Sequence, residues 1–109
     1  MSVGLYKYSG DIEDDNSTVL LSEPIASQRI YDQYFTAAIS ELGILYFQDG
    51  AEIRFENLER VLLEIQLLME WIQNKVNGEE KQFLLERLVR IKSVVADSLR
   101  TKADILYVF

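Results

Sequence analysis

The stretch from Asn57 to Val76, NLERVLLEIQLLMEWIQNKV, decides the fold more clearly than any other. Its apolar residues recur at intervals of three and four, the spacing of one face of an α-helix, and Asn57 is a candidate N-cap. Leu63, Leu67 and Trp71 widen this apolar face. Because so wide a face must be covered on two sides, we expect a sheet and another helix to pack against it.

The residues that follow predict that other helix. Asn77-Gly78 interrupts the pattern, and Glu79-Glu80 place negative charge where the dipole at a helix N-terminus favours it. An apolar residue then recurs every three or four positions to about residue 101, at Leu84, Leu88, Ile91, Val95 and Leu99. The short turn between the two segments predicts an antiparallel helical pair.

The first quarter of the chain predicts two strands. Residues 3–8, VGLYKY, are rich in aromatic and branched types and end at the turn pair Ser9-Gly10. Residues 18–21, TVLL, predict a second strand that stops before Pro24. Together these two segments predict a hairpin whose connecting loop is acidic.

Another helix and another hairpin are expected in the middle of the chain. From about residue 24 to residue 42 the apolar residues recur every four positions, which predicts an amphipathic helix with Gly43 as its C-terminal cap. Asp49-Gly50 then lies between the apolar segments 44–48 and 51–55. Because a type I′ turn needs positive φ at both central residues, this pair predicts a two-residue hairpin.

The chain closes on a continuous apolar run, ILYVF at residues 105–109, which predicts a buried or interfacial strand. The expected order of elements is therefore β-β-α-β-β-α-α-β. This order predicts an α+β fold with a small, mostly antiparallel sheet packed against about three helices. No repeat or linker divides residues 1–109, so we expect a single domain.

Composition excludes most enzyme chemistry. The chain has 109 residues and a net charge of −7, and it contains neither His nor Cys. The usual zinc, haem and iron–sulfur ligands and the Ser-His and Cys-His nucleophile pairs are therefore absent. Glu59, Glu64 and Glu70 lack the histidines of a di-iron bundle, so we place them on a solvated helix face. We expect no enzymatic activity, no catalytic residues, no metal site and no cofactor.

The distribution of charge indicates the class of partner. Residues 1–78 hold 5 basic and 13 acidic side chains, whereas residues 79–109 hold 6 and 5. Because phosphate recognition needs clustered Lys and Arg, we expect no nucleic-acid partner and instead a basic protein. The alternative interpretation is that a net charge of this size only keeps a small protein soluble. No apolar run approaches the roughly 18 to 20 residues of a membrane span, and we expect a cytoplasmic protein without membrane contact.

The densest charge cluster is DIEDDN at residues 11–16. A calcium-binding EF-hand loop needs Gly at position six and Glu at position twelve, where this chain has Asn16 and Ser22. Three interpretations stay open: a weak cation site, a solvated loop, and a docking patch in which carboxylates steer a basic partner towards aromatic rings. The candidate partner-binding residues for the docking patch are Tyr6, Tyr8, Asp11, Glu13, Asp14 and Asp15.

A resemblance to a known family rests on two short segments, MSVGLY at residues 1–6 and YFTAAIS at residues 34–40. Through them the chain is similar to the small cytosolic immunity proteins of bacterial polymorphic-toxin systems. The resemblance implies an α+β inhibitor that binds a cationic toxin domain, often a nuclease, and blocks it sterically and electrostatically. The alternative is an oligomerising structural or adaptor protein, such as a homodimer, with residues 105–109 and the broad helix surfaces as its interface.

Overall fold

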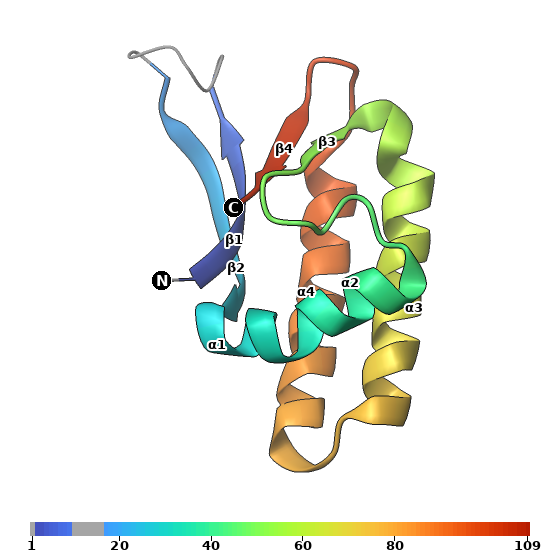
Figure 1. Cartoon of the computed structure of the whole chain (residues 1–109). Helices are drawn as coiled ribbons and strands as arrows, with labels where there is room; N and C mark the ends of the chain where they lie inside the picture. Colours follow the sequence, from blue (N-terminus) through green and yellow to red (C-terminus); the bar gives the residue numbers. More distant parts are fainter. Residues whose placement is uncertain (1, 10–16) are drawn as a thin grey trace.

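The computed structural model describes residues 2–9 and 17–109 (Figure 1). Its strands are β1 (Ser2–Tyr8), β2 (Val19–Ser27), β3 (Glu52–Arg54) and β4 (Ile105–Val108). Its helices are α1 (Gln28–Ile30), α2 (Thr36–Leu42), α3 (Leu58–Lys75) and α4 (Gly78–Ser98), with a π-helical turn at Tyr31–Phe35 and a 3-10 turn at Phe55–Asn57. The α+β fold class predicted from the sequence is confirmed.

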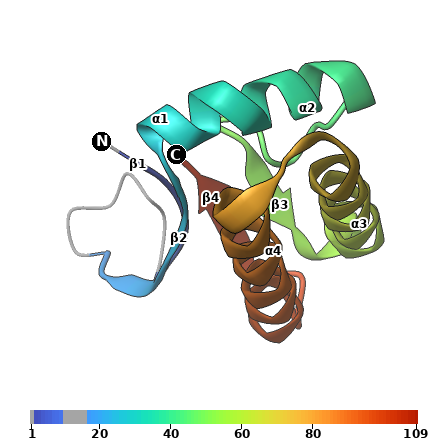
Figure 2. The ribbon, with the colours of Figure 1, turned by 90° about the horizontal axis from the view of Figure 1, so that it is seen from below.

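The four strands form one antiparallel sheet in the order β2-β1-β4-β3. Helices α3 and α4 form the expected antiparallel pair and lie on one side of this sheet (Figures 1 and 2). The helical segment from α1 to α2 starts at the end of β2 and runs along one side of the molecule towards α3 (Figure 2). The wide apolar face of α3 is therefore covered by neighbours on more than one side, as the sequence predicts.

The core lies between the sheet and the helical pair. Alternation along the strands turns every second side chain towards α3 and α4, where apolar side chains recur at helical spacing. The side chains that fill this layer, each at most 1% exposed, are Val3, Leu5, Ile53, Leu106 and Val108 from the sheet and Val61, Ile65, Leu68, Ile72, Leu84, Leu88, Ile91 and Val95 from the helices.

Two short-range predictions are confirmed at the helix ends. Gly43 follows α2 with φ of +70°, a left-handed conformation that glycine adopts without a side-chain penalty. The break predicted at Asn77-Gly78 is found, because α3 ends at Lys75 and α4 begins at Gly78, which has φ of +72°. Both turns depend on backbone angles that one or two residues determine, so the sequence alone is enough to locate them.

The boundary between β2 and the first helix is corrected. The strand was expected to stop before Pro24, but it continues to Ser27. Gly4, opposite Pro24, exchanges both of its backbone hydrogen bonds with Phe109, the residue after β4, at 2.8 and 3.1 Å. The ring nitrogen of Pro24 therefore faces away from β1, where its missing N–H breaks no hydrogen bond of the sheet. Helix α1 starts after Ser27, whose hydroxyl accepts the N–H of Ile30 at 3.3 Å.

The hairpin predicted around Asp49-Gly50 is wrong. Residues 44–50 form no strand, and β3 pairs with β4 instead of with residues 44–48. Gly50 has the positive φ that the sequence predicts, at +95°, but its N–H donates to Val108 of β4 at 2.6 Å. The expected order of elements therefore holds with one strand fewer.

A buried carboxylate explains why residues 44–50 do not form a strand. Glu64 of α3 was assigned to a solvated helix face, but it is fully buried. Its two oxygens accept the N–H groups of Leu45 and Tyr46, at 3.0 and 2.9 Å, and the Nε–H of Arg60 at 3.2 Å. The backbone donors that a hairpin would need are thus already bound to a side chain from another element.

Side chains also bind the carbonyl groups of the same segment. The Tyr31 hydroxyl donates to the carbonyl of Phe47 at 2.6 Å, and the Gln48 amide donates to that of Ile44 at 2.8 Å. Burial raises the pKa of Tyr31, so the hydroxyl stays a donor over the whole physiological range. The segment therefore satisfies its polar groups without a strand partner and places Ile44 and Phe47, both at most 1% exposed, in the core.

We predict that Glu64→Gln destabilises the protein by about 1–3 kcal/mol, because the amide has one acceptor oxygen and turns a donor towards the second buried N–H. Urea unfolding followed by circular dichroism measures this change. Glu70→Gln, an exposed position on the same helix, is the matched control and should change stability by less than about 0.5 kcal/mol. Equal stabilities of the two variants would contradict the role given to Glu64.

Candidate functional site on the open face of the sheet

The side of the sheet opposite α3 and α4 carries the candidate site. Alternation along β1 and β4 turns Leu5 and Val108 into the core and leaves Tyr6 and Tyr107 on the opposite side. We call that side the open face. Cross-strand pairing assigns to it Gly4, Tyr6 and Tyr8 of β1, Val19, Ser22 and Pro24 of β2, Glu52 and Arg54 of β3, and Ile105, Tyr107 and Phe109 at the C-terminal strand.

Four aromatic rings form the centre of the open face. The ring of Tyr6 stacks on that of Phe109, with centroids 4.6 Å apart and an angle of 18°. The ring of Tyr8 meets Tyr107 edge-on at 5.9 Å and 68°. Tyr6 and Tyr107 are cross-strand partners, so the two ring pairs are neighbours. All four side chains are partly exposed, and Phe109 is 42% exposed.

Gly4 provides the floor beneath one of these rings. A Cβ atom at this position would lie 3.0 Å from Cε2 of Tyr6 and 3.1 Å from its hydroxyl oxygen. The backbone at Gly4 needs no positive φ, so the glycine is required here for space and not for conformation. Its absent side chain lets the Tyr6 ring lie close to the sheet and stack on Phe109.

The open face is poor in positive charge. Arg54 is the one basic side chain among its described residues, and its Nη2 donates to Glu52 at 3.0 Å. Lys7 of β1 is turned to the helix side, where its ammonium donates to the carbonyl of Ser98 at 3.0 Å and to Asp104 at 2.8 Å. That bond, with two backbone N–H groups, holds the pKa of Asp104 well below its usual range.

The edges of the sheet are unsuited to pairing with another strand. At one edge Pro24 presents a ring nitrogen where an N–H would point outward, and at the other β3 has only three residues. The strand of residues 105–108, expected as a possible self-interface, lies between β1 and β3 and offers no free edge. Neither edge of the sheet is therefore well suited to accept a further strand.

The structure places only part of the predicted site. Tyr6 and Tyr8 lie on the open face as described, whereas Asp11, Glu13, Asp14 and Asp15 lie outside the described residues. The chain enters and leaves this acidic segment beside Tyr8, because the N–H of Ser9 donates to the carbonyl of Thr18 at 2.9 Å. Ser9 and Thr18, which flank this segment in the sequence, therefore lie side by side at the end of β1 that carries Tyr8.

Sequence reasoning missed the other half of the aromatic group. Tyr107 and Phe109 were read as parts of one continuous apolar run, and Gly4 and Glu52 were not singled out. The run does contain a signal, because its aromatic residues alternate with Leu106 and Val108, which are buried. The pairing of β4 with β1, just over a hundred residues earlier, is not encoded in any local pattern.

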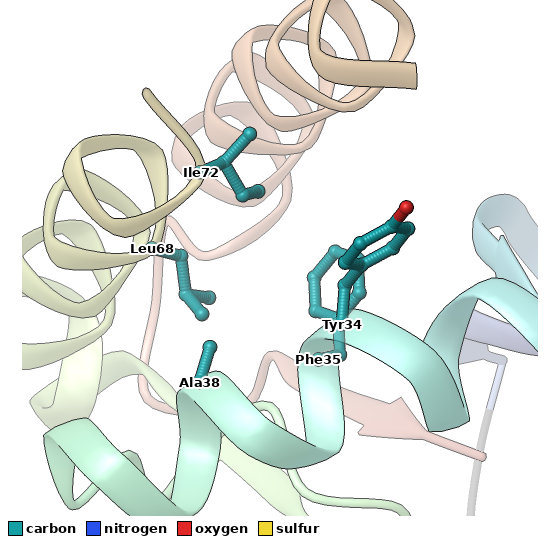
Figure 3. A pocket seen from close by; sticks show the side chains of 5 residues that line it. All are labelled: Tyr34, Phe35, Ala38, Leu68 and Ile72. Carbon is teal, nitrogen blue, oxygen red and sulfur yellow. The ribbon is translucent and has the colours of Figure 1, made fainter. Parts of the chain in front are cut away.

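A small cavity between α3 and the helical segment formed by the π-helical turn and α2 is a packing seam. The side chains around it are Tyr34, Phe35, Ala38, Leu68 and Ile72 (Figure 3). The space among them does not admit a water molecule, so it offers no room for a ligand. The Tyr34 hydroxyl points away from the seam and donates to Glu80, and this bond raises the pKa of Tyr34.

Metal binding and membrane insertion find no support in the described part of the chain. In residues 2–9 and 17–109 no three acidic side chains gather in a way that would hold a metal ion. The helices of the same residues include none with the length and apolarity needed to cross a membrane.

Comparisons with known proteins find no relative of this chain. The chain matches no protein-family model, and neither curated proteins nor solved structures show a significant similarity to it. A function is therefore proposed from the chemistry of the open face.

We predict that Gly4→Ala displaces the Tyr6 ring from its stack with Phe109 while changing the free energy of unfolding by less than about 1 kcal/mol, because only a ring must move. Near-ultraviolet circular dichroism and the ring proton shifts measure the displacement. Gly43→Ala is the converse control. Open space surrounds Gly43, but its positive φ should cost about 1 kcal/mol without altering the aromatic signals. Unchanged ring signals in Gly4→Ala would show that Tyr6 does not lie over Gly4.

Proposed function

We propose that this protein is a small, acidic, non-enzymatic inhibitor that binds a basic protein domain on the open face of its sheet. The resemblance to the immunity proteins of bacterial polymorphic-toxin systems implies an inhibitor that binds and blocks a toxin domain, and the proposed target is a cationic toxin domain. The inhibitor blocks that domain by covering it and by opposing its charge. The single observation that carries the proposal is the group of four partly exposed aromatic rings on a rigid, acidic scaffold.

The aromatic group supports a protein partner. Tyr and other aromatic side chains are enriched among the residues that dominate binding energy, because they bury a large area at a small cost in side-chain entropy. Tyr6, Tyr8, Tyr107 and Phe109 are ordered by mutual contacts and by the sheet beneath them. A partner that covers them pays little to immobilise them.

The charge of the chain supports a basic partner. The net charge is −7, and the acidic excess falls entirely within residues 1–78, which supply β1, β2 and β3. Asp11, Glu13, Asp14 and Asp15 belong to the segment that begins and ends beside Tyr8. Carboxylates in such a position accelerate the approach of a cationic protein to the aromatic group.

The same charges argue against nucleic acid as the partner. Aromatic side chains on a sheet also stack on single-stranded bases, but such sites combine them with Lys and Arg that follow the phosphates. On the open face Arg54 is bound to Glu52, and Lys7 is turned to the other side of the sheet. A phosphate backbone would therefore meet no unpaired cation among the described residues of this face.

Self-association is the weaker alternative. The edges of the sheet are blunted by Pro24 and by the shortness of β3, and two copies that met through their open faces would each bring a charge of −7. Repulsion of this kind disfavours a homodimer at low salt. An adaptor that assembles with itself is therefore the second choice.

We predict that the chain protects cells from a toxin-like domain encoded beside its own gene. Growth is measured with the domain expressed alone and together with the chain, and the purified proteins are expected to form a 1:1 complex. The double variant Tyr8→Ala with Phe109→Ala should weaken the complex at least about tenfold, because it removes two central rings.

The matched control is Leu63→Ala with Val89→Ala, two exposed apolar positions on α3 and α4, which should bind as the unmodified chain does. A chain that forms only salt-insensitive homodimers and never protects would overturn the inhibitor assignment. If the two double variants bound the partner equally well, the binding site would not lie on the open face.

A separate prediction concerns the acidic segment. Replacing Asp11, Glu13, Asp14 and Asp15 by their amides should slow association with the basic partner about tenfold at low salt and leave stability almost unchanged. Stopped-flow measurements over a range of salt should show the difference shrinking near roughly 0.5 M, where screening removes long-range steering. An unaltered rate and salt dependence would show that the segment is ordinary solvated surface.

A further inference from the structure

We propose that the open face recognises a guanidinium group. An arginine side chain of the basic partner lies over the Tyr6 and Tyr107 rings, and its head binds Glu52, the carboxylate that Arg54 occupies in the free protein. This inference rests on the proposed function, because it names the chemistry by which the partner is held. The juxtaposition that carries it is a carboxylate beside partly exposed tyrosine rings, with an internal arginine already bound to that carboxylate.

The position of Glu52 follows from the register of the sheet. Glu52 is the cross-strand partner of Tyr107, which in turn is the cross-strand partner of Tyr6. Side chains paired in this way project from the same face with Cβ atoms about 4.5–5.5 Å apart. A planar cation that lies over the Tyr107 ring is therefore within reach of the Glu52 carboxylate, and the Tyr6 ring lies one strand further away.

The chain already holds one guanidinium by the same combination of groups. On α4, Cζ of Arg87 lies 5.7 Å from the centre of the Phe83 ring, and its Nη1 is 3.4 Å from Glu23 of β2. An aromatic ring and a carboxylate thus hold an arginine from two directions. Glu52 and the tyrosine rings present the same pair of groups on the open face.

The bond between Glu52 and Arg54 is suited to exchange. Its N–O distance is 3.0 Å, but both side chains are about half exposed, at 49% and 46%. Exposed ion pairs of this kind contribute little to stability, because water competes for both partners. An arginine of the partner, which gains ring contacts as well, can replace Arg54 on the carboxylate.

Arginine fits this surface better than lysine. The guanidinium group is planar, stacks on aromatic rings and offers two parallel N–H groups to a carboxylate, whereas the ammonium group of lysine is compact and strongly hydrated. The net charge of −7 selects a cationic group over an anionic one. Arg54 then acts as an internal competitor, since it both occupies Glu52 and repels an incoming cation.

The experiment uses two peptide probes, blocked hexa-arginine and blocked hexalysine, titrated at low salt into the full chain. Nuclear magnetic resonance of the tyrosine rings reports the site, and the titration gives the affinity. We expect hexa-arginine to shift the ring signals of Tyr6 and Tyr107 and to bind roughly threefold more tightly than hexalysine. Glu52→Gln should weaken hexa-arginine binding by a similar factor.

Arg54→Gln provides the most specific test, because it should tighten hexa-arginine binding by roughly threefold. Lys92→Gln, an exposed position on α4, changes the net charge by the same amount and is the matched control. Tighter binding by Arg54→Gln than by Lys92→Gln supports an internal competitor. Equal effects of the two variants, or equal affinity for the two peptides, overturn arginine recognition at this face.

Failure of this inference differs from failure of the proposed function. If the chain protects against the toxin-like domain and the open-face variants lose that protection while the peptides show no preference, the inhibitor stands and arginine recognition falls. If the peptides bind as expected and no protection is seen, the chemistry of the face stands and the inhibitor assignment falls.

Discussion

The buried carboxylate of Glu64 is the constraint on which the arrangement of the sheet depends. Because it binds two backbone N–H groups of residues 44–50, the chain after α2 turns inward, fills the core and reaches the end of β4. β3 follows directly after residues 44–50, and this path of the chain places Glu52 opposite Tyr107. The buried Glu64 carboxylate is tolerated because three N–H groups donate to its oxygens. The path that it imposes on residues 44–50 also places the Glu52 carboxylate of β3 on the open face.

The sheet serves two purposes through the alternation of its strands. In β1, Leu5 and Lys7 face the helices, where one fills the core and the other binds the C-terminal end of α4. Tyr6 and Tyr8 face away from the helices, and their rings contact Phe109 and Tyr107 respectively. Turning Lys7 towards α4 keeps its positive charge away from the open face, so the placement that ties β1 to α4 also leaves Arg54 as the one basic side chain among the described residues of that face.

Local patterns predicted the helices and their turns well, and they failed where distant side chains competed for the backbone. The turn at Asn77-Gly78 and the cap at Gly43 depend on φ preferences of single residues, and both are found. Asp49-Gly50 has the same local chemistry, but side chains from α3 and from the π-helical turn bind the polar groups that a hairpin would use. Glu64 was misplaced for the same reason: its position on the helix suggests water, and its partners come from a segment about twenty residues earlier.

The candidate site, too, was predicted only in part from local sequence patterns. The sequence by itself determined the acidic charge, the absence of His and Cys, the amphipathic helical pair, and the aromatic character of the first and last strands. Only the tertiary structure decided that these strands are neighbours, that Tyr6 stacks on Phe109 over Gly4, and that Glu52 lies beside them. The physical reason is that helical faces and tight turns arise from residues a few positions apart, whereas the register of a sheet is set by packing between residues that lie about a hundred positions apart in this chain.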